Sequence, residues 1–297
     1  MTAERPIINY RQKALVGLLS ALGGSAGNTD FQKYLFLYAQ EFEDTPSFEF
    51  VPYKYGCFSF QSYADKRRLI EIGALEDTAD WKLSSDFLVQ PGDNSKFDEF
   101  VATRGKLKGD RLIKYVYKTY PYYAINSEIA EEKLTTEELK MIDSSRPSFD
   151  QPCFFTIGYE GSSFEGYLNR LLQNGVHMLI DVRRNPLSRK YGFSKKTLSE
   201  TVEKLGIKYL HIPELGIASE KRRELITQSD YDQLFDEYEC QELIDNKASI
   251  RRIANLMKQH HRIAITCFEA HVCMCHRGRV ANALSELADW DYDIRHI

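Results

Sequence analysis

The sequence lacks several features that would assign it to a class of protein at once. Its 297 residues contain no run of the roughly 18 apolar residues that a membrane-spanning helix needs, and its first residues include no apolar signal segment. Six cysteines are too few for a disulfide scaffold in a chain of this length, so we expect a cytoplasmic protein with no membrane partner. The net charge of −4 excludes a polycation, so any anion binding must be local.

The composition is sufficient for two folded domains. Apolar residues make up 43% and charged residues 28% of the chain, which is typical of globular proteins, and domains average about 150 residues. The segment Met141–Pro152 has two prolines, three serines and no hydrophobic periodicity, which is typical of a linker. We therefore expect a domain at residues 1–148 and another at residues 152–297.

The first half has the pattern of helices interspersed with short strands. Apolar residues recur at helical spacing in Asn9–Leu22, in Thr29–Gln40 and in Phe58–Ile72. Phe48–Tyr55 is aromatic and extended, and Trp81–Val89 alternates as a short strand or wing would. A further stretch, residues 106–139, is mostly helical in pattern, and we expect its five tyrosines to pack against a neighbouring helix.

Part of this half resembles winged-helix-like domains that carry a Y-x-Y-G-P-F-S element. The resemblance lies in FQKYLFLYAQ, FEFVPYKYGCFS and the following helix, and Cys57 stands where proline is usual. It implies a module that contacts DNA or another protein. The excess of acidic residues in this half favours a protein partner, whereas Lys66, Arg67 and Arg68 are candidates for nucleic-acid binding.

Strands alternate with helices in the second half. Apolar runs predict strands at Cys153–Gly158, His177–Val182, Ile207–His211 and Arg262–Phe268, and helices at Ser163–Asn174, Lys195–Leu205 and Arg277–Leu287. This order predicts an α/β fold, a three-layer domain with a mostly parallel sheet. The mainly helical winged-helix-like domain would precede it.

Chemically active residue types follow all four predicted strands. Because ligands of parallel sheets bind beyond the carboxyl ends of the strands, we expect these residues to share one pocket. The candidates for ligand binding are Gly158, Tyr159, Asp181, Arg183, Arg184, His211, Cys267, His276 and Arg277, and the candidates for catalysis are Glu160, Glu269 and Cys275.

The same residues carry a second resemblance. The segments IGYEGSSFEGYLNRL, LIDVRRNPLSRKYGFSKKTL, IKYLHIPELG and ITCFEAHVCMCHR resemble, in order and spacing, the domain-of-unknown-function family four-eight-eight. The resemblance covers about residues 154–290. It implies the fold of that family but no settled activity.

The residue types suggest chemistry on a phosphate-bearing ligand. Arg277, at the start of the last predicted helix, can hold a phosphate through two parallel hydrogen bonds, and a thiol at that position, Cys275, should have a lowered pKa. Six cations without an intervening acid follow Asp181, beginning at Arg183 and Arg184. Arg183 could instead form a structural salt bridge to Asp181 or Glu269, and His211 could simply close its strand.

Glu160 or Glu269 could transfer protons, which predicts hydrolysis or transfer on a nucleotide or nucleic acid. The alternative is a non-enzymatic DNA-binding or protein-interaction regulator that senses a nucleotide-like ligand. The spacing of Cys273 and Arg279 matches a cysteine phosphatase loop but lies too far beyond the strand.

A zinc site was the last alternative. Its candidate ligands, which include His271, lie within ten residues but lack C-x-x-C spacing, so we expect no metal and no other cofactor. The oligomeric state stays open.

Overall fold

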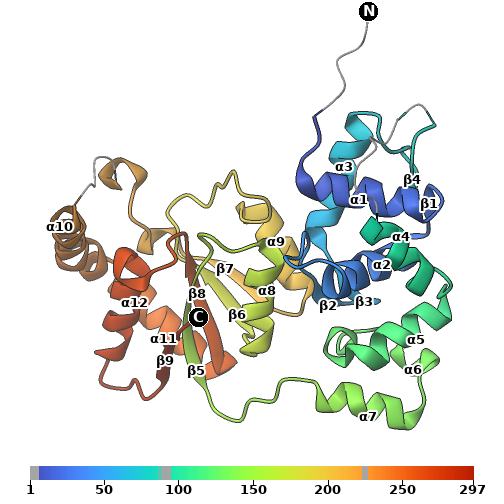
Figure 1. Cartoon of the computed structure of the whole chain (residues 1–297). Coiled ribbons are helices and arrows are strands. Elements are labelled where there is room, and N and C mark those ends of the chain that lie inside the picture. The colour runs from blue at the N-terminus through green and yellow to red at the C-terminus, as the bar shows by residue number, and fades with distance from the viewer. Residues whose placement is uncertain (1–6, 86, 88–94, 223–226) are drawn as a thin grey trace, which may run out of the picture. The chain divides into compact units, whose positions relative to one another are not determined.

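The computed structural model describes residues 7–85, 87, 95–222 and 227–297. The chain divides into two units, Met1–Arg146 (unit 1) and Pro147–Ile297 (unit 2) (Figure 1). The segment expected to be a linker is partly helical, because helix α7 covers Thr136–Ser144 and buries Ile142. Its start is fixed by Thr135, which caps the helix in a reciprocal pair with Glu138. Among the described residues, no helix is both long and apolar enough to cross a membrane.

Unit 1 is mainly helical. The first helix begins where the side chains of Asn9 and Gln12 each accept a hydrogen bond from the other residue's backbone amide. The third helix begins at Ser59, whose side chain accepts a hydrogen bond from the amide of Ser62. The helices, including the short 3-10 turn η1, are α1 (Tyr10–Ala21), α2 (Asn28–Glu41), α3 (Phe60–Glu71), α4 (Ser95–Arg104), α5 (Asp110–Thr119), η1 (Pro121–Ala124), α6 (Ala130–Lys133) and α7.

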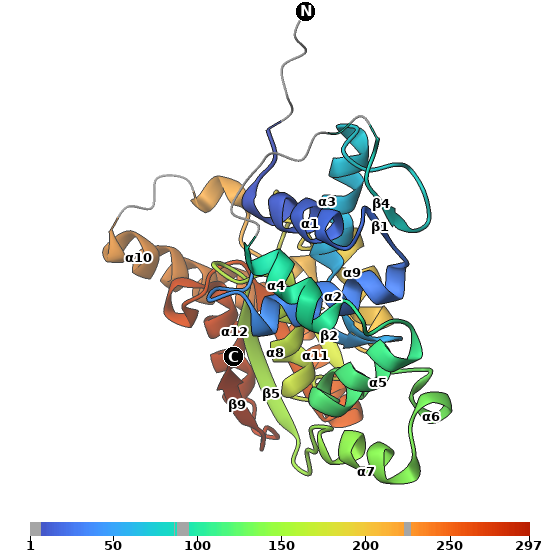
Figure 2. The same cartoon turned by 45° about the vertical axis from the view of Figure 1, so that its right-hand side comes forward.

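Two pairs of very short antiparallel strands lie between these helices. Strand β1 (Ser25–Ala26) pairs with β4 (Trp81–Lys82), and the two lie side by side in Figure 2. Strands β2 (Val51–Tyr53) and β3 (Gly56–Phe58) form a hairpin. The strand expected at Trp81–Val89 is therefore confirmed only at its start, and Asp86 and residues 88–89 lie outside the described residues.

Aromatic side chains dominate the core of unit 1. Trp81 is completely buried and stacks on Phe31, with ring centroids 4.3 Å apart. Phe36 of α2 makes edge contacts with Phe50, Tyr120 and Tyr123 at 4.6–5.2 Å. The tyrosines after residue 106 that reach this core pack against helix α2, as expected.

Unit 2 contains a five-stranded sheet in which every neighbouring pair is parallel. Its order is β7-β6-β8-β5-β9. The strands are β5 (Cys153–Gly158), β6 (Met178–Asp181), β7 (Lys208–His211), β8 (Arg262–Cys267) and β9 (Asp293–His296). β5, β6 and β8 are buried along their whole length, as expected of central parallel strands. β9, an edge strand with mostly exposed side chains, was not predicted from the sequence.

Helices cover both faces of this sheet. α8 (Phe164–Gln173) and α9 (Lys195–Lys204) lie on one face (Figure 1), and α11 (Lys247–His260) and α12 (His276–Ser285) lie on the other. Side chains of the second face, among them Phe154, Ile180 and Ile265, share one core with α11 and α12. The remaining elements are η2 (Pro213–Leu215), η3 (Ser219–Arg222), α10 (Gln228–Tyr238), the π-helical turn η4 (Glu239–Leu243) and η5 (Val272–Met274). The expected α/β fold is confirmed.

Candidate functional site

The topology of unit 2 brings β5 and β8 together at its centre. The two strands are neighbours, yet the helix after β5, α8, lies on one face and the helix after β8, α12, lies on the other (Figure 1). Adjacent strands whose connections diverge in this way open a crevice at their carboxyl ends, where α/β proteins bind ligands. The candidate residues after Gly158 and Cys267 border that position.

Main chain fills much of this crevice. The amides of Tyr159 and Glu160 both donate to Phe268 O, at 3.1 and 2.8 Å, so the loop after β8 lies directly across the end of β5. A side chain at Gly158 would place its Cβ 1.9 Å from Glu269 O. Gly158 therefore permits a close approach of two backbone segments, which is a structural role.

Arg277 holds this loop in place. The side chain is 1% exposed, and its guanidinium donates to Glu269 O, to Ala270 O at 2.8 Å and to Thr156 Oγ1 at 3.4 Å. Every nitrogen of the guanidinium thus faces an acceptor of the protein itself. The expectation that Arg277 presents a fork to a phosphate does not match this geometry.

Arg183 and Asp181 form a buried pair. Arg183 Nε lies 2.8 Å from Asp181 Oδ1 and Nη2 lies 2.5 Å from Oδ2, while Nη1 donates to Tyr159 Oη and Phe193 O. Burial works against the charge of Arg183, but the hydrogen bonds and charge of Asp181 outweigh it and raise the pKa of Arg183. The salt-bridge alternative that the sequence left open for Arg183 is the arrangement found.

Two other candidates are also used internally. The ring of Tyr159 stacks on Phe193, with centroids 4.2 Å apart and planes inclined by 9°, so it offers no open face to a base. Both ring nitrogens of His211 are used. Nε2 donates to Arg183 O at 2.9 Å, and Nδ1 accepts from Lys195 Nζ at 3.0 Å. The second contact ties the end of β7 to the first residue of α9.

The two candidate acids differ in their surroundings. Glu160 is exposed, and its Oε2 accepts a hydrogen bond from the amide of Ala270 at 3.0 Å. Glu269 is half-buried, and its Oε2 lies 3.3 Å from Cys267 Sγ. Both carboxylates lie at the rim formed by the loops after β5 and β8.

A buried cluster of sulfur and imidazole lies beneath this rim. One donor atom from each of Cys267, Cys275 and His276 lies within 4.8 Å of the other two, and all three residues are buried. Burial raises the pKa of Cys275 well above its ordinary value, and the neighbouring thiol of Cys267 raises it further. The expectation that a helix N-terminus makes Cys275 a thiolate is therefore wrong, because burial outweighs the helix dipole.

Comparison with protein families places this half of the chain. Residues 163–284 match the family model described as Domain of unknown function DUF488. The C-terminal part of the chain is thus similar to the DUF488 family. No curated protein and no solved structure matches the chain. The match includes the cluster residues Cys267, Cys275 and His276, whereas the turn at Gly158 precedes it.

Five cations follow β6 in unit 2, and all of them except the half-buried Lys190 are exposed. Within the described residues, none of these five side chains forms an ion pair with a carboxylate. Lys190 Nζ donates a hydrogen bond to Tyr159 O at 3.1 Å. Burial, the largest influence, lowers the pKa of Lys190. They are Arg184, Arg189, Lys190, Lys195 and Lys196.

Cys273 and Arg279 do not form a cysteine phosphatase loop in unit 2. Cys273 is exposed within the short turn η5, and Arg279 pairs with Glu239 at 3.2 Å. His271 is also exposed. Neither Cys273 nor His271 joins the buried cluster.

The three nucleic-acid candidates of unit 1 have different environments. Lys66 is buried, and its Nζ donates to three consecutive carbonyls, those of Thr78, Ala79 and Asp80, at 2.9–3.3 Å. Burial lowers the pKa of Lys66, so this side chain supports the loop before β4 and does not face solvent. Arg67 and Arg68 are exposed, and Arg68 pairs with Glu71 at 2.9 Å.

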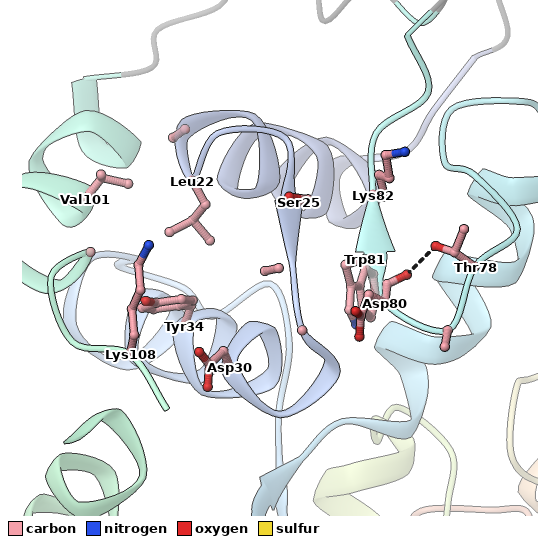
Figure 3. A pocket seen from close by; sticks show the side chains of 15 residues that line it. Leu22, Ser25, Asp30, Tyr34, Thr78, Asp80, Trp81, Lys82, Val101 and Lys108 are labelled. Carbon is pink, nitrogen blue, oxygen red and sulfur yellow. Dashed lines mark hydrogen bonds between the residues drawn. The ribbon is translucent and has the colours of Figure 1, made fainter. Parts of the chain in front are cut away.

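Unit 1 also has a cavity of about 840 Å³ that was not predicted from the sequence. Figure 3 shows Asp30, Tyr34 and Lys108 on one side of it and Trp81 on another. Its walls come from the end of α1, from α2, from the loop around β4 and from residues 101–108. No motif spans segments so far apart in the chain.

Proposed function

We propose that the carboxyl edge of the unit 2 sheet binds a phosphate-bearing ligand, a nucleotide or a nucleic-acid backbone. The observation that carries this proposal is the set of five cations between Arg184 and Lys196 that have no carboxylate partner among the described residues. Lysines and arginines gathered in one loop and at the start of α9 create a local positive field in a half of the chain that has no net charge. Phosphate oxygens satisfy such groups better than water does when several bind at once.

Arg183 and Arg277 support this site from below. Both guanidinium groups are enclosed by protein acceptors, so their role in the proposal is to fix the loops on which the exposed cations stand. Arg184 differs, because it is exposed and makes one long hydrogen bond, 3.4 Å, to Pro213 O. It is therefore the first residue of the run that can reach a ligand.

Glu160 is the candidate acid or base for hydrolysis or transfer. Its carboxylate is exposed, and a single amide, that of Ala270, holds one oxygen. The other oxygen can face a bound ligand or a water molecule. Glu269 is the second candidate, with its carboxylate directed to Cys267. A positioned carboxylate typically contributes about 10²–10⁴-fold to a proton-transfer step.

Thermal unfolding with and without ligand tests the binding proposal. We expect nucleotides or short nucleic acids to stabilise the full chain, by about 2.7 kcal/mol at a ligand concentration of about 100 Kd. Arg184→Glu combined with Lys196→Glu should abolish the stabilisation. The matched control is Lys204→Glu with Lys208→Glu, which reverses two exposed charges at the other end of α9 and at the start of β7. An equal loss in both double variants would refute the proposed site.

Turnover separates an enzyme from a sensor. Glu160→Gln keeps the shape and the hydrogen bond from Ala270 but removes the basic carboxylate. An enzyme that uses Glu160 loses product formation while ligand-induced stabilisation persists. A sensor forms no product in either variant, and its stabilisation is equal in both.

A non-enzymatic DNA- or partner-binding regulator is the second candidate, and unit 1 supports it. Its order of helix, short strand, helix, helix and a final short strand resembles that of a winged helix, with the β2–β3 hairpin inserted before α3. Leu75 bridges Leu83 next to the β1–β4 pair, as the strands of a wing would. Arg67→Glu with Arg68→Glu should abolish a salt-dependent gel shift if α3 contacts DNA.

We propose a cytoplasmic location for the chain. None of the six cysteines is in a disulfide, and four of them are buried, namely Cys57, Cys153, Cys267 and Cys275. Buried cysteines without disulfide partners are more common in proteins of reducing compartments than in secreted proteins. The test is a fusion of the chain to a reporter that is active only in the cytoplasm, with reporter activity measured in intact cells.

A further inference from the structure

We infer that the buried cluster at the carboxyl end of β8 is a binding site for a thiophilic divalent cation, with zinc as the expected ion. Its protein ligands are Cys267, Cys275 and His276. This site lies beneath the edge where we propose ligand binding, and it does not depend on that proposal.

The fold brings the three ligands together from two elements. Cys267 is the last residue of β8 and lies on the face of the sheet that α12 covers, in register with Ile263 and Ile265. Cys275 caps the N-terminus of α12, and His276 is the first residue of that helix. Each of the three side chains is at most 2% exposed. They are therefore fixed by the packing of α12 on the sheet.

The distances suit a tetrahedral ion. Zinc binds sulfur at about 2.3 Å and imidazole nitrogen at about 2.0–2.1 Å, so two such ligands at a tetrahedral angle lie about 3.6 Å apart. Cys267 Sγ and His276 Nδ1 are 3.6 Å apart. The ligand atoms of all three residues lie within 4.8 Å of one another, so small rotations of side chains bring them onto one ion.

The imidazole is oriented as a metal ligand would be. His276 Nε2 lies 3.0 Å from Val182 O, and a carbonyl can only accept a hydrogen bond, so Nε2 carries the proton. Nδ1 then has its lone pair directed toward Cys267. An imidazole that donates its remote N–H to a backbone carbonyl while the other nitrogen faces sulfur is the usual support for a bound histidine.

The charges also balance around a divalent cation. Two buried thiolates carry two negative charges, which a divalent ion neutralises, and binding it releases the two thiol protons. Glu269, 3.3 Å from Cys267 Sγ, retains one negative charge. Arg277, whose charge acts on Cys275, supplies a positive one. Three protein ligands leave a fourth position, and the carboxylate of Glu269 is beside it.

Metal content of the full chain is the first test. We expect one zinc ion per chain in protein purified under reducing conditions without a metal-affinity step, measured by plasma mass spectrometry. Cys275→Ser and His276→Gln should each lower zinc affinity by roughly tenfold or more. His276→Gln retains an N–H that can reach Val182 O. The matched controls, Cys273→Ser and His271→Gln, alter exposed residues of the same loop and should keep the wild-type zinc content.

Cobalt substitution keeps the test independent of folding in the variants. Wild-type protein treated with a chelator and then with Co²⁺ should develop sulfur-to-cobalt charge transfer and the intense visible bands of a tetrahedral ion. Chelation should also lower its melting temperature, and Zn²⁺ should restore it. The inference is overturned if wild-type protein binds neither ion, if Cys275→Ser retains full zinc content, or if Cys267 and Cys275 are found joined as a disulfide.

Discussion

Asp181 and Arg183, only two residues apart, form a bidentate ion pair at the end of β6 that is almost completely enclosed. The carboxylate is 0% and the guanidinium 6% exposed. Arg183 contacts both oxygens of the Asp181 carboxylate, and Tyr209 Oη also donates to Oδ2 at 2.7 Å. The pair anchors the loop that carries the exposed cations, so its loss affects both stability and the proposed ligand site.

Asp181→Asn should destabilise unit 2 strongly. The substitution leaves the Arg183 charge buried without a counter-ion, and breaking a buried pair in this way typically costs about 3–5 kcal/mol. Urea unfolding followed by circular dichroism measures the loss. The control is Asp289→Asn, which breaks exposed pairs with Arg251 and Lys258 and should cost at most about 1 kcal/mol. Similar losses for both variants would contradict the structural role of the Asp181 pair.

Gly158→Ala should disrupt the contact between the loops after β5 and β8. The new Cβ would lie 1.9 Å from Glu269 O, and because both partners are backbone, one loop must move. Overpacking of this kind typically costs about 1–3 kcal/mol. Thermal melting measures the loss, and Gly27→Ala is the control because only Asp80 lies near, at 3.9 Å. A variant as stable as wild type would mean that the two loops separate freely.

Much of the fold could be predicted from local pattern. β5 and β8 are apolar runs because central parallel strands are buried on both faces, and the predicted bounds of β5 agree with the structure. β9 could not be predicted, because its side chains are mostly exposed and its strand forms only by pairing with β5, which includes the bond from Ile297 N to Thr156 O. Its existence depends on tertiary structure.

The sequence pattern predicted that the candidate residues follow the carboxyl ends of the strands, but it did not predict which way their side chains point. The sequence identified which residues gather at the carboxyl edge, since the strand ends fix that. It could not tell whether a guanidinium points outward or inward, and both Arg183 and Arg277 point inward. The direction of the Cys275 pKa shift could not be predicted for a similar reason. The helix N-terminus, which lowers the pKa, can be identified from local sequence, whereas the burial that raises it depends on how α12 packs against β8.

Acidification should destabilise unit 2 through His296. His296 is exposed, but partial desolvation of its ring, with the charge of Arg277, lowers its pKa below the ordinary 6.5, and its Nδ1 lies 2.9 Å from Thr156 Oγ1. As the pH falls below about 6.5, the unfolded chain takes up this proton first, so stability falls until the pH passes the folded pKa. Melting curves between about pH 7.5 and about pH 5 measure the slope.

His296→Asn should flatten that slope, because the substituted side chain does not titrate. His271→Asn changes an exposed side chain elsewhere and should leave the slope as in wild type. If the two variants show the same dependence on pH, the loss of stability arises from other groups, and His296 is not its source.

Lys66 should matter for the stability of unit 1 and not for any binding of DNA. Lys66→Met keeps the aliphatic length but removes the ammonium group that satisfies the carbonyls of Thr78, Ala79 and Asp80. Loss of hydrogen bonds to a charged group typically costs about 1–3 kcal/mol, whereas Arg67→Ala, at an exposed position, should change stability by no more than about 0.5 kcal/mol. Chemical unfolding of the two variants compares them directly. A charge reversal that included Lys66 would combine a loss of stability with any loss of DNA binding, so α3 must be tested with Arg67 and Arg68 only. A Lys66→Met variant as stable as wild type would remove that objection and return Lys66 to the candidate surface.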